Sequence, residues 1–197
     1  MRYLADIATL EKGTVKPLNA SLRDLAGDCG GASIDVVTYG AGVRAVINAI
    51  KLDAAVSPSF KLNNLIAIVP DIDADALDDA FVRTIGQYAR RTTFYVSATD
   101  PALIESKRRR TRTAADARGS AAPVLRVGDA AQRVWTATGV DVVDVSGFDA
   151  SLGNPLSRDD ASVVADLYQV LEGLEPSSRR YLRRVETPTA SYWQLSR

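Results

Sequence analysis

The chain has 197 residues, of which 46% are apolar and 24% charged, a size that suits one domain with a hydrophobic core. Its 24 basic and 24 acidic residues cancel, so no net charge draws it to nucleic acid or to an anionic membrane, and we expect no nucleic-acid partner. The chain has no histidine, which excludes histidine acid–base catalysis within the chain. Its single cysteine, Cys29, excludes an internal disulfide and a multi-cysteine zinc site.

The N-terminal segment carries charges at Arg2 and Asp6 and lacks the apolar stretch of a secretory signal peptide. No part of the sequence approaches the roughly 20 apolar residues that a membrane-spanning helix needs. We therefore expect a soluble protein with no membrane span, in the cytoplasm or another reducing compartment.

Apolar and β-branched runs alternate with amphipathic helical patterns along the chain. A helical pattern at 15–25 leads into a first predicted strand at 34–39, and further strands are predicted at 65–69, 92–96 and 140–145. The helices predicted after these four strands cover 43–50, 77–88, a segment that begins at Asp100-Pro101, and 163–174. The inner face of the last helix is predicted to carry Val163, Val164, Leu167, Val170, Leu171 and Leu174. This alternation predicts an α/β fold, a three-layer parallel sheet with helices on both faces.

Two stretches interrupt the alternation. Charged residues, alanine, glycine and proline at 107–127 predict an exposed excursion between the third and fourth strands, and the basic run 107–112 within it is interpreted as a solvated helix end. An arginine-rich tail at 177–197 contains the adjacent aromatic residues Tyr192 and Trp193, so we expect the tail to pack on the domain. No boundary divides the chain, and we predict a single domain at 1–197.

The turn after the first strand, Thr38-Tyr39-Gly40-Ala41-Gly42, has two incompatible functional interpretations. Gly40, Gly42 and Ala45 match a G-x-G-x-x-A dinucleotide fingerprint, which also requires an acidic residue about 20 positions further on. The acidic residue at the end of the next strand, Asp71, lies 31 positions after Gly40 (71 − 40). The same turn also has the place of a G-x-S-x-G nucleophile elbow, with glycine where the serine would be.

Five segments together resemble a bacterial α/β-hydrolase family of unknown function whose members carry an A-H-S-M-G elbow. The segments are 37–42, 69–75, 95–100, 140–146 and 152–154, and the resemblance spans about residues 3–195. It implies the C-terminal part of an α/β-hydrolase fold. It also places Gly40 at the position of the nucleophile, Asp100 at that of the acid and Asn154 at that of the histidine.

Two of these three residues cannot perform the role that the resemblance assigns to them. Glycine has no side chain to attack a carbonyl, and asparagine cannot act as a titrating base near neutral pH. We therefore interpret Gly40, Asp100 and Asn154 as vestigial triad positions, and expect no catalytic residue, cofactor or metal. The preferred hypothesis is a non-catalytic hydrolase-like protein that acts through protein contacts, as a subunit of a larger assembly. Two alternatives stay open: an ester or acyl hydrolase that needs residues from elsewhere, and a dinucleotide-binding module that uses the Gly40–Gly42 turn.

Members of this fold have strands ahead of the elbow strand, whereas this sequence begins about one helix before it. We therefore expect residues 34–38 to lie at the edge of the sheet with unpaired amides. A protein partner, or a separate N-terminal half, is predicted to cover that edge.

Other polar residues have simpler interpretations. Asp100 precedes Pro101 in the pattern of a helix N-cap. The aspartates do not match the spacing of an EF-hand loop, so we expect solvated residues at a helix start rather than metal ligands. These are Asp71, Asp73, Asp75, Asp78 and Asp79. The hydroxyls near strand ends, at Thr38, Ser97 and Ser146, are expected to bond the backbone or cap turns.

Overall fold

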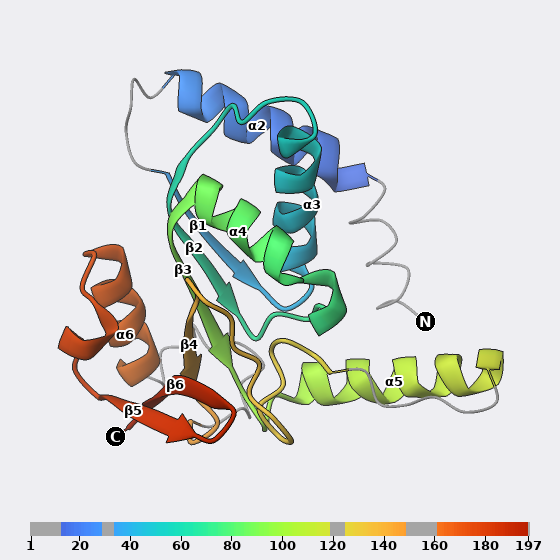
Figure 1. Ribbon diagram of the computed structural model, residues 1–197, viewed down its shortest axis with the longest axis vertical. Coiled ribbons are helices and arrows are strands. Elements are labelled where there is room, and N and C mark those ends of the chain that lie inside the picture. Colours follow the sequence, from blue (N-terminus) through green and yellow to red (C-terminus); the bar gives the residue numbers. More distant parts are fainter. Residues whose placement is uncertain (1–12, 29–33, 119–124, 149–160, 197) are drawn as a thin grey trace.

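The computed structural model describes residues 13–28, 34–118, 125–148 and 161–196, with side chains placed for all of these except 110–118. One six-stranded sheet runs through the described residues in the order β1-β2-β3-β4-β6-β5 (Figure 1). The strands are β1 (Asp35–Tyr39), β2 (Leu62–Ile68), β3 (Ala89–Val96), β4 (Asp141–Asp144), β5 (Leu182–Thr187) and β6 (Ala190–Leu195). Each neighbouring pair is parallel except β5 with β6, which form an antiparallel hairpin.

Helices connect the strands at the positions that the periodicity predicts. They are α2 (Val15–Asp28), α3 (Gly42–Ala54), α4 (Asp79–Tyr88), α5 (Pro101–Arg118) and α6 (Ala161–Leu171), with short 3-10 turns η2 (Ala74–Ala76) and η4 (Pro176–Ser178). Asp78 caps α4, because its carboxylate accepts a hydrogen bond from the Phe81 amide at 2.7 Å. None of the described helices has the length and apolarity to cross a membrane.

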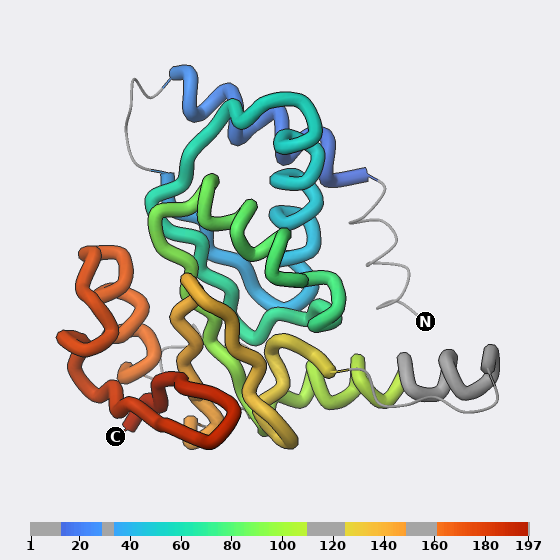
Figure 2. Tube along the Cα trace, viewed as in Figure 1, coloured from blue at the N-terminus to red at the C-terminus, as the bar shows by residue number. Residues whose placement is uncertain are grey.

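Successive strand residues point to opposite faces of the sheet, and each face has its own buried core. Leu65 and Phe94 belong to the core under α2, α3 and α4, whereas Ile66 and Tyr95 belong to the core under α6 and the start of α5. Figure 2 shows α3 and α4 on one side of the sheet and α6 on the other. The predicted three-layer α/β class is therefore confirmed.

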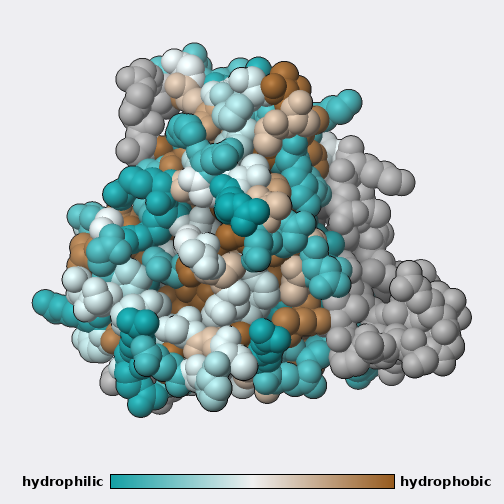
Figure 3. Space-filling model, viewed as in Figure 1, coloured by the Kyte–Doolittle hydropathy of each residue, from teal (hydrophilic) through white to brown (hydrophobic). Residues whose placement is uncertain are grey.

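The face of the molecule drawn in Figure 3 is mostly hydrophilic, with hydrophobic residues in small separate patches. This is the distribution that amphipathic helices give when their apolar sides face a sheet. α6 departs from it, because Val164, predicted on the inner face, is exposed. Val163 and Val170 are buried as predicted.

The tail at 177–197 contains β5 and β6, two strands that the sequence pattern did not indicate. β6 pairs with β4 and so extends the parallel sheet, and Leu195 is buried. Arg179 is also buried and bonds to Asp166 of α6 at 3.1 Å. The same Asp166 oxygen accepts a hydrogen bond from the Tyr95 hydroxyl at 2.7 Å, so one polar cluster joins the tail, α6 and the sheet. Burial raises the pKa of Asp166, a change that the positive charge of Arg179 opposes.

The predicted excursion at 107–127 divides into two parts. Residues up to 118 continue α5, which extends away from the sheet in Figure 1. The end of the stretch is not exposed, because Arg126 and Val127 are both buried. That part of the prediction is wrong, because Arg126 is ion-paired with Asp71 and Asp73 and does not extend into solvent.

Candidate functional site

The turn between β1 and α3 holds Gly40 in a left-handed backbone conformation, with a φ of 53°. The Gly40 amide donates to the carbonyl of Ile68 at 2.9 Å, and the Gly40 carbonyl accepts from the amide of Asp71 at 3.0 Å. An added Cβ would meet nothing within 4 Å. The turn therefore has the left-handed backbone expected of a nucleophile elbow, and it leaves open space where a side chain of residue 40 would project.

Asp100, which the resemblance places at the position of the acid, lies after β3 and is buried. One of its carboxylate oxygens accepts from the Leu103 amide at 2.7 Å, which makes it the N-cap of α5. The other oxygen accepts from the hydroxyl of Tyr39 at 3.1 Å. The structure thus brings the Gly40 turn and Asp100 to the same end of the sheet, with Tyr39 as the link. Asn154 and Cys29 lie outside the described residues.

Tyr39 has no basic character that could replace the absent histidine. Burial raises its pKa to about 12, and the negative charge of Asp100 and its hydrogen bond add to the shift. The phenol is therefore protonated at neutral pH and acts as a hydrogen-bond donor. A general base near this turn needs a pKa close to neutral, and Tyr39 does not supply one.

The hydroxyl groups near the strand ends bond the backbone, as predicted. Thr38 donates to the carbonyl of Ile66 at 3.4 Å. Ser97 accepts from the amide of Thr99 at 3.1 Å, and Ser146 accepts from the amide of Ala98 at 2.7 Å. These bonds fix the loops after β1, β3 and β4 relative to the sheet.

A buried cluster of charged residues beside the turn was not found from the sequence. The guanidinium of Arg126 is ion-paired with both Asp71 and Asp73, and it lies 3.0 Å from the hydroxyl of Ser106. Arg44 donates to the backbone carbonyl of Asp71 at 2.7 Å. The expectation that Asp71 and Asp73 are solvated helix-start residues is therefore wrong. The one available signal was that Arg126 lies between the apolar Leu125 and Val127, as in a buried extended segment.

This cluster bears on the metal and dinucleotide interpretations. Among the described residues no group of three or more carboxylate, cysteine or histidine side chains is arranged to hold a metal ion. The dinucleotide interpretation needs an acidic side chain that is free to bind a ribose. Asp71 is 2% exposed, and its two carboxylate oxygens are bonded to Arg126 and to Ser106. Its geometry therefore does not favour nucleotide binding.

One of the comparisons with known proteins found a match, to a family model that covers most of the chain. The family model described as "Alpha/beta hydrolase of unknown function (DUF900)" matches residues 6–174, a range that includes β1 to β4 and α6 and ends before the β5–β6 hairpin. No curated protein and no solved structure matches the chain at a significant level.

Proposed function

We propose that this chain, which belongs to the family of α/β hydrolases of unknown function (DUF900), is a non-catalytic member of that family. We further propose that it acts through protein contacts at the edge of β1. In this proposal the chain is a subunit of a larger assembly, and a strand of a partner protein or of a separate N-terminal half covers that edge.

Loss of catalysis is supported by the residues at positions 40 and 100 and by the composition of the chain. Gly40 offers no nucleophile, and the carboxylate of Asp100 is engaged by Tyr39 and by the start of α5. The whole chain lacks histidine. A serine at residue 40 would therefore still have no base to accept its proton.

The open edge of β1 is the observation that supports protein contact most directly. β1 pairs with β2 alone among the described strands. Because the Gly40 amide bonds to Ile68 of β2, the alternation of a parallel strand directs the backbone groups of Asp35, Val37 and Tyr39 to the opposite side. Val37 is also 41% exposed. An edge strand with free amides and an exposed valine is a template for another strand.

Restoring the nucleophile should not restore catalysis. We expect Gly40→Ser to lower the free energy of unfolding by about 1 to 2 kcal/mol, because a side chain is strained at positive φ but meets no atoms here. Hydrolysis of a short-chain nitrophenyl ester should stay at the background rate in both the original chain and the variant. Turnover by the original chain that is lost in Asp100→Ala would contradict the proposal and favour the hydrolase alternative.

The edge contact can be tested by hydrogen exchange and by isolation of the assembly. In the chain alone, the amides of Val37 and Tyr39 should exchange much faster than those of Val36 and Thr38, which face β2. In the assembly isolated from its source, Val37 and Tyr39 should become protected.

Val37→Lys should release the partner, since a charged edge side chain opposes strand addition. The matched control is Val185→Lys on β5, at the other end of the sheet, which should retain the partner. If the chain is isolated free of any other protein, stays folded, and exchanges these edge amides rapidly, the proposal is wrong.

A further inference from the structure

The β5–β6 hairpin is attached to the rest of the sheet by a short pairing. β6 pairs with β4 at Val143–Trp193 and Asp144–Gln194, the shortest pairing in the described sheet. β5 and β6, by contrast, pair with each other along their whole length. Leu195 is the one buried residue of the hairpin, and the others are half-buried or exposed. The hairpin is therefore a self-contained unit that few buried side chains hold to the domain.

Arg179 anchors the hairpin to α6 through a buried ion pair. Its Nη1 lies 3.1 Å from Oδ2 of Asp166, and neither side chain is exposed. The other polar atoms of the pair, Asp166 Oδ1 and Arg179 Nε and Nη2, are buried without a hydrogen-bond partner among the described residues. A buried polar atom without a partner costs free energy, which it regains by bonding to water once it is exposed. The pair that anchors the hairpin therefore also lowers the cost of its release.

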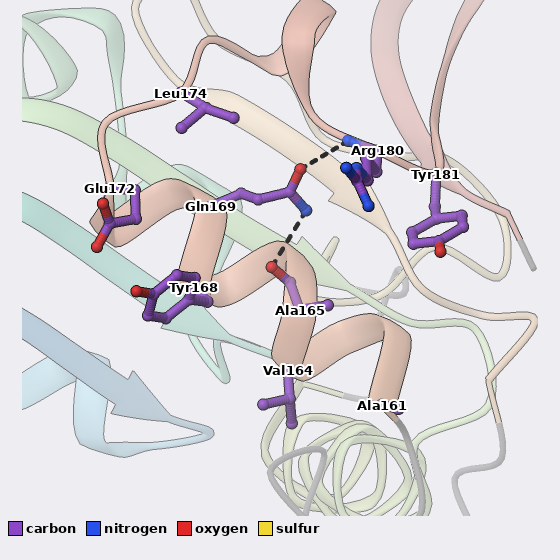
Figure 4. A pocket seen from close by; sticks show the side chains of 9 residues that line it. All are labelled: Ala161, Val164, Ala165, Tyr168, Gln169, Glu172, Leu174, Arg180 and Tyr181. Carbon is purple, nitrogen blue, oxygen red and sulfur yellow. Dashed lines mark hydrogen bonds between the residues drawn. The ribbon is translucent and has the colours of Figure 1, made fainter.

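The chain just before η4 is held to the sheet independently of the hairpin. Arg91 of β3 donates to the carbonyl of Leu174 at 2.6 Å and is ion-paired with Glu175. Beyond η4, the amide of Arg180 donates to Gln169 of α6 at 2.7 Å (Figure 4). Opening of the hairpin breaks this last bond and leaves the Arg91 contacts intact. The turn η4 therefore separates a fixed segment from one that can move, which is the position of a hinge.

We propose that the β5–β6 hairpin is a reversible cover of the β4 edge, which opens as one unit about η4 while β1 to β4 and their helices stay folded. Opening gives Asp166 and Arg179 access to water and turns β4 into an edge strand. Such local opening, at a free energy below that of global unfolding, is typical of elements with few buried apolar contacts. The cover lies at the opposite end of the sheet from β1, so it does not depend on the proposed contact at the β1 edge.

Native-state hydrogen exchange of the full chain tests this opening with two neighbouring amides of β4. The Val145 amide donates to Val96 of β3 at 2.9 Å. The alternation of a parallel strand therefore directs the Val143 amide to β3 and the Asp144 amide to β6. After correction for intrinsic exchange rates, the Asp144 amide should exchange at least tenfold faster than the Val143 amide. The reason is that Asp144 needs only the hairpin to open, whereas Val143 needs the sheet to unfold.

Two variants separate opening of the hairpin from unfolding of the whole domain. Ile85→Val weakens the core under α4, which stays folded when the hairpin opens. It should speed exchange of the Val143 amide about two- to tenfold and leave the Asp144 amide unchanged. Arg179→Met removes an interaction that only the closed state makes. It should therefore speed exchange of both amides by the same factor, at least tenfold.

Three results would overturn the proposal. Equal protection of Val143 and Asp144 in the original chain would mean that the hairpin opens only when the domain unfolds. The same conclusion would follow if Ile85→Val sped exchange of the two amides equally. An Asp144 amide that Arg179→Met leaves unchanged would show that Arg179 does not hold the hairpin closed.

Discussion

Replacing Arg126 with alanine should lower the free energy of unfolding by about 3 to 5 kcal/mol, because it leaves a buried carboxylate without its counter-charge. Arg126 is 1% exposed, and its partner Asp71 is almost as deeply buried. The backbone of Asp71 in turn bonds to Gly40 and to Arg44. Loss of the guanidinium therefore affects both the core and the Gly40 turn.

Urea denaturation of the original chain and the variant measures this loss. Arg108→Ala is the matched control, since Arg108 also pairs with a carboxylate, Glu105 at 3.4 Å, but its side chain on α5 is 61% exposed. That change should cost no more than about 0.5 kcal/mol. Combining Arg126→Ala with Asp71→Asn should recover part of the loss, because the unpaired charge is then removed. A cost below about 1 kcal/mol for Arg126→Ala would show that the buried pair is not needed for stability.

Most of the fold could be predicted because its elements have simple local periodicity. The second half of the buried strand β2, residues 65–68, is a continuous apolar run, and α4 begins at a capping aspartate and places Val82, Ile85 and Tyr88 on one side. These patterns depend on neighbours within one element, so a single sequence is sufficient to find them. Five elements in the order strand, helix, strand, helix, strand then favour a parallel sheet.

The β5–β6 hairpin could not be predicted in the same way. β5 is exposed along most of its length and carries Arg183, Arg184 and Glu186, so it lacks the clean alternation of a half-buried strand. Its place in the sheet depends on β6, which pairs with β4 through Val143 and Trp193, 50 positions apart (193 − 143). Such pairing between distant segments has no local signal.

The candidate site was predictable in part. The parallel topology places the ends of β1 and β3 at one edge of the sheet, so the approach of Gly40 and Asp100 follows from the strand order. The bond between Tyr39 and Asp100 does not, because it depends on how one side chain is oriented after folding. Arg126 was missed for a related reason: its burial is possible only because two distant aspartates meet it.

Gly128→Ala should destabilise the chain by about 2 to 4 kcal/mol, although it adds only one methyl group. A Cβ at this position would lie 2.7 Å from the carbonyl oxygen of Pro70 and 2.8 Å from its nitrogen. Both are backbone atoms, which cannot rotate away as a side chain can. The Gly128 amide also donates to the Pro70 carbonyl at 3.0 Å, and its carbonyl accepts from the amide of Ser97 at 2.9 Å. The added methyl group would therefore push the segment around Gly128 away from the loop that follows β2.

Gly86→Ala is the matched control for this clash. Gly86 lies on the exposed side of α4, where an added Cβ meets nothing within 4 Å. Because alanine is the better helix former, that change should raise the free energy of unfolding by up to about 1 kcal/mol. Thermal and urea denaturation of the two variants should thus move in opposite directions. If Gly128→Ala were as stable as the original chain, the loop that carries Arg126 and Gly128 could not lie against Pro70, and the buried charge cluster would need a different arrangement.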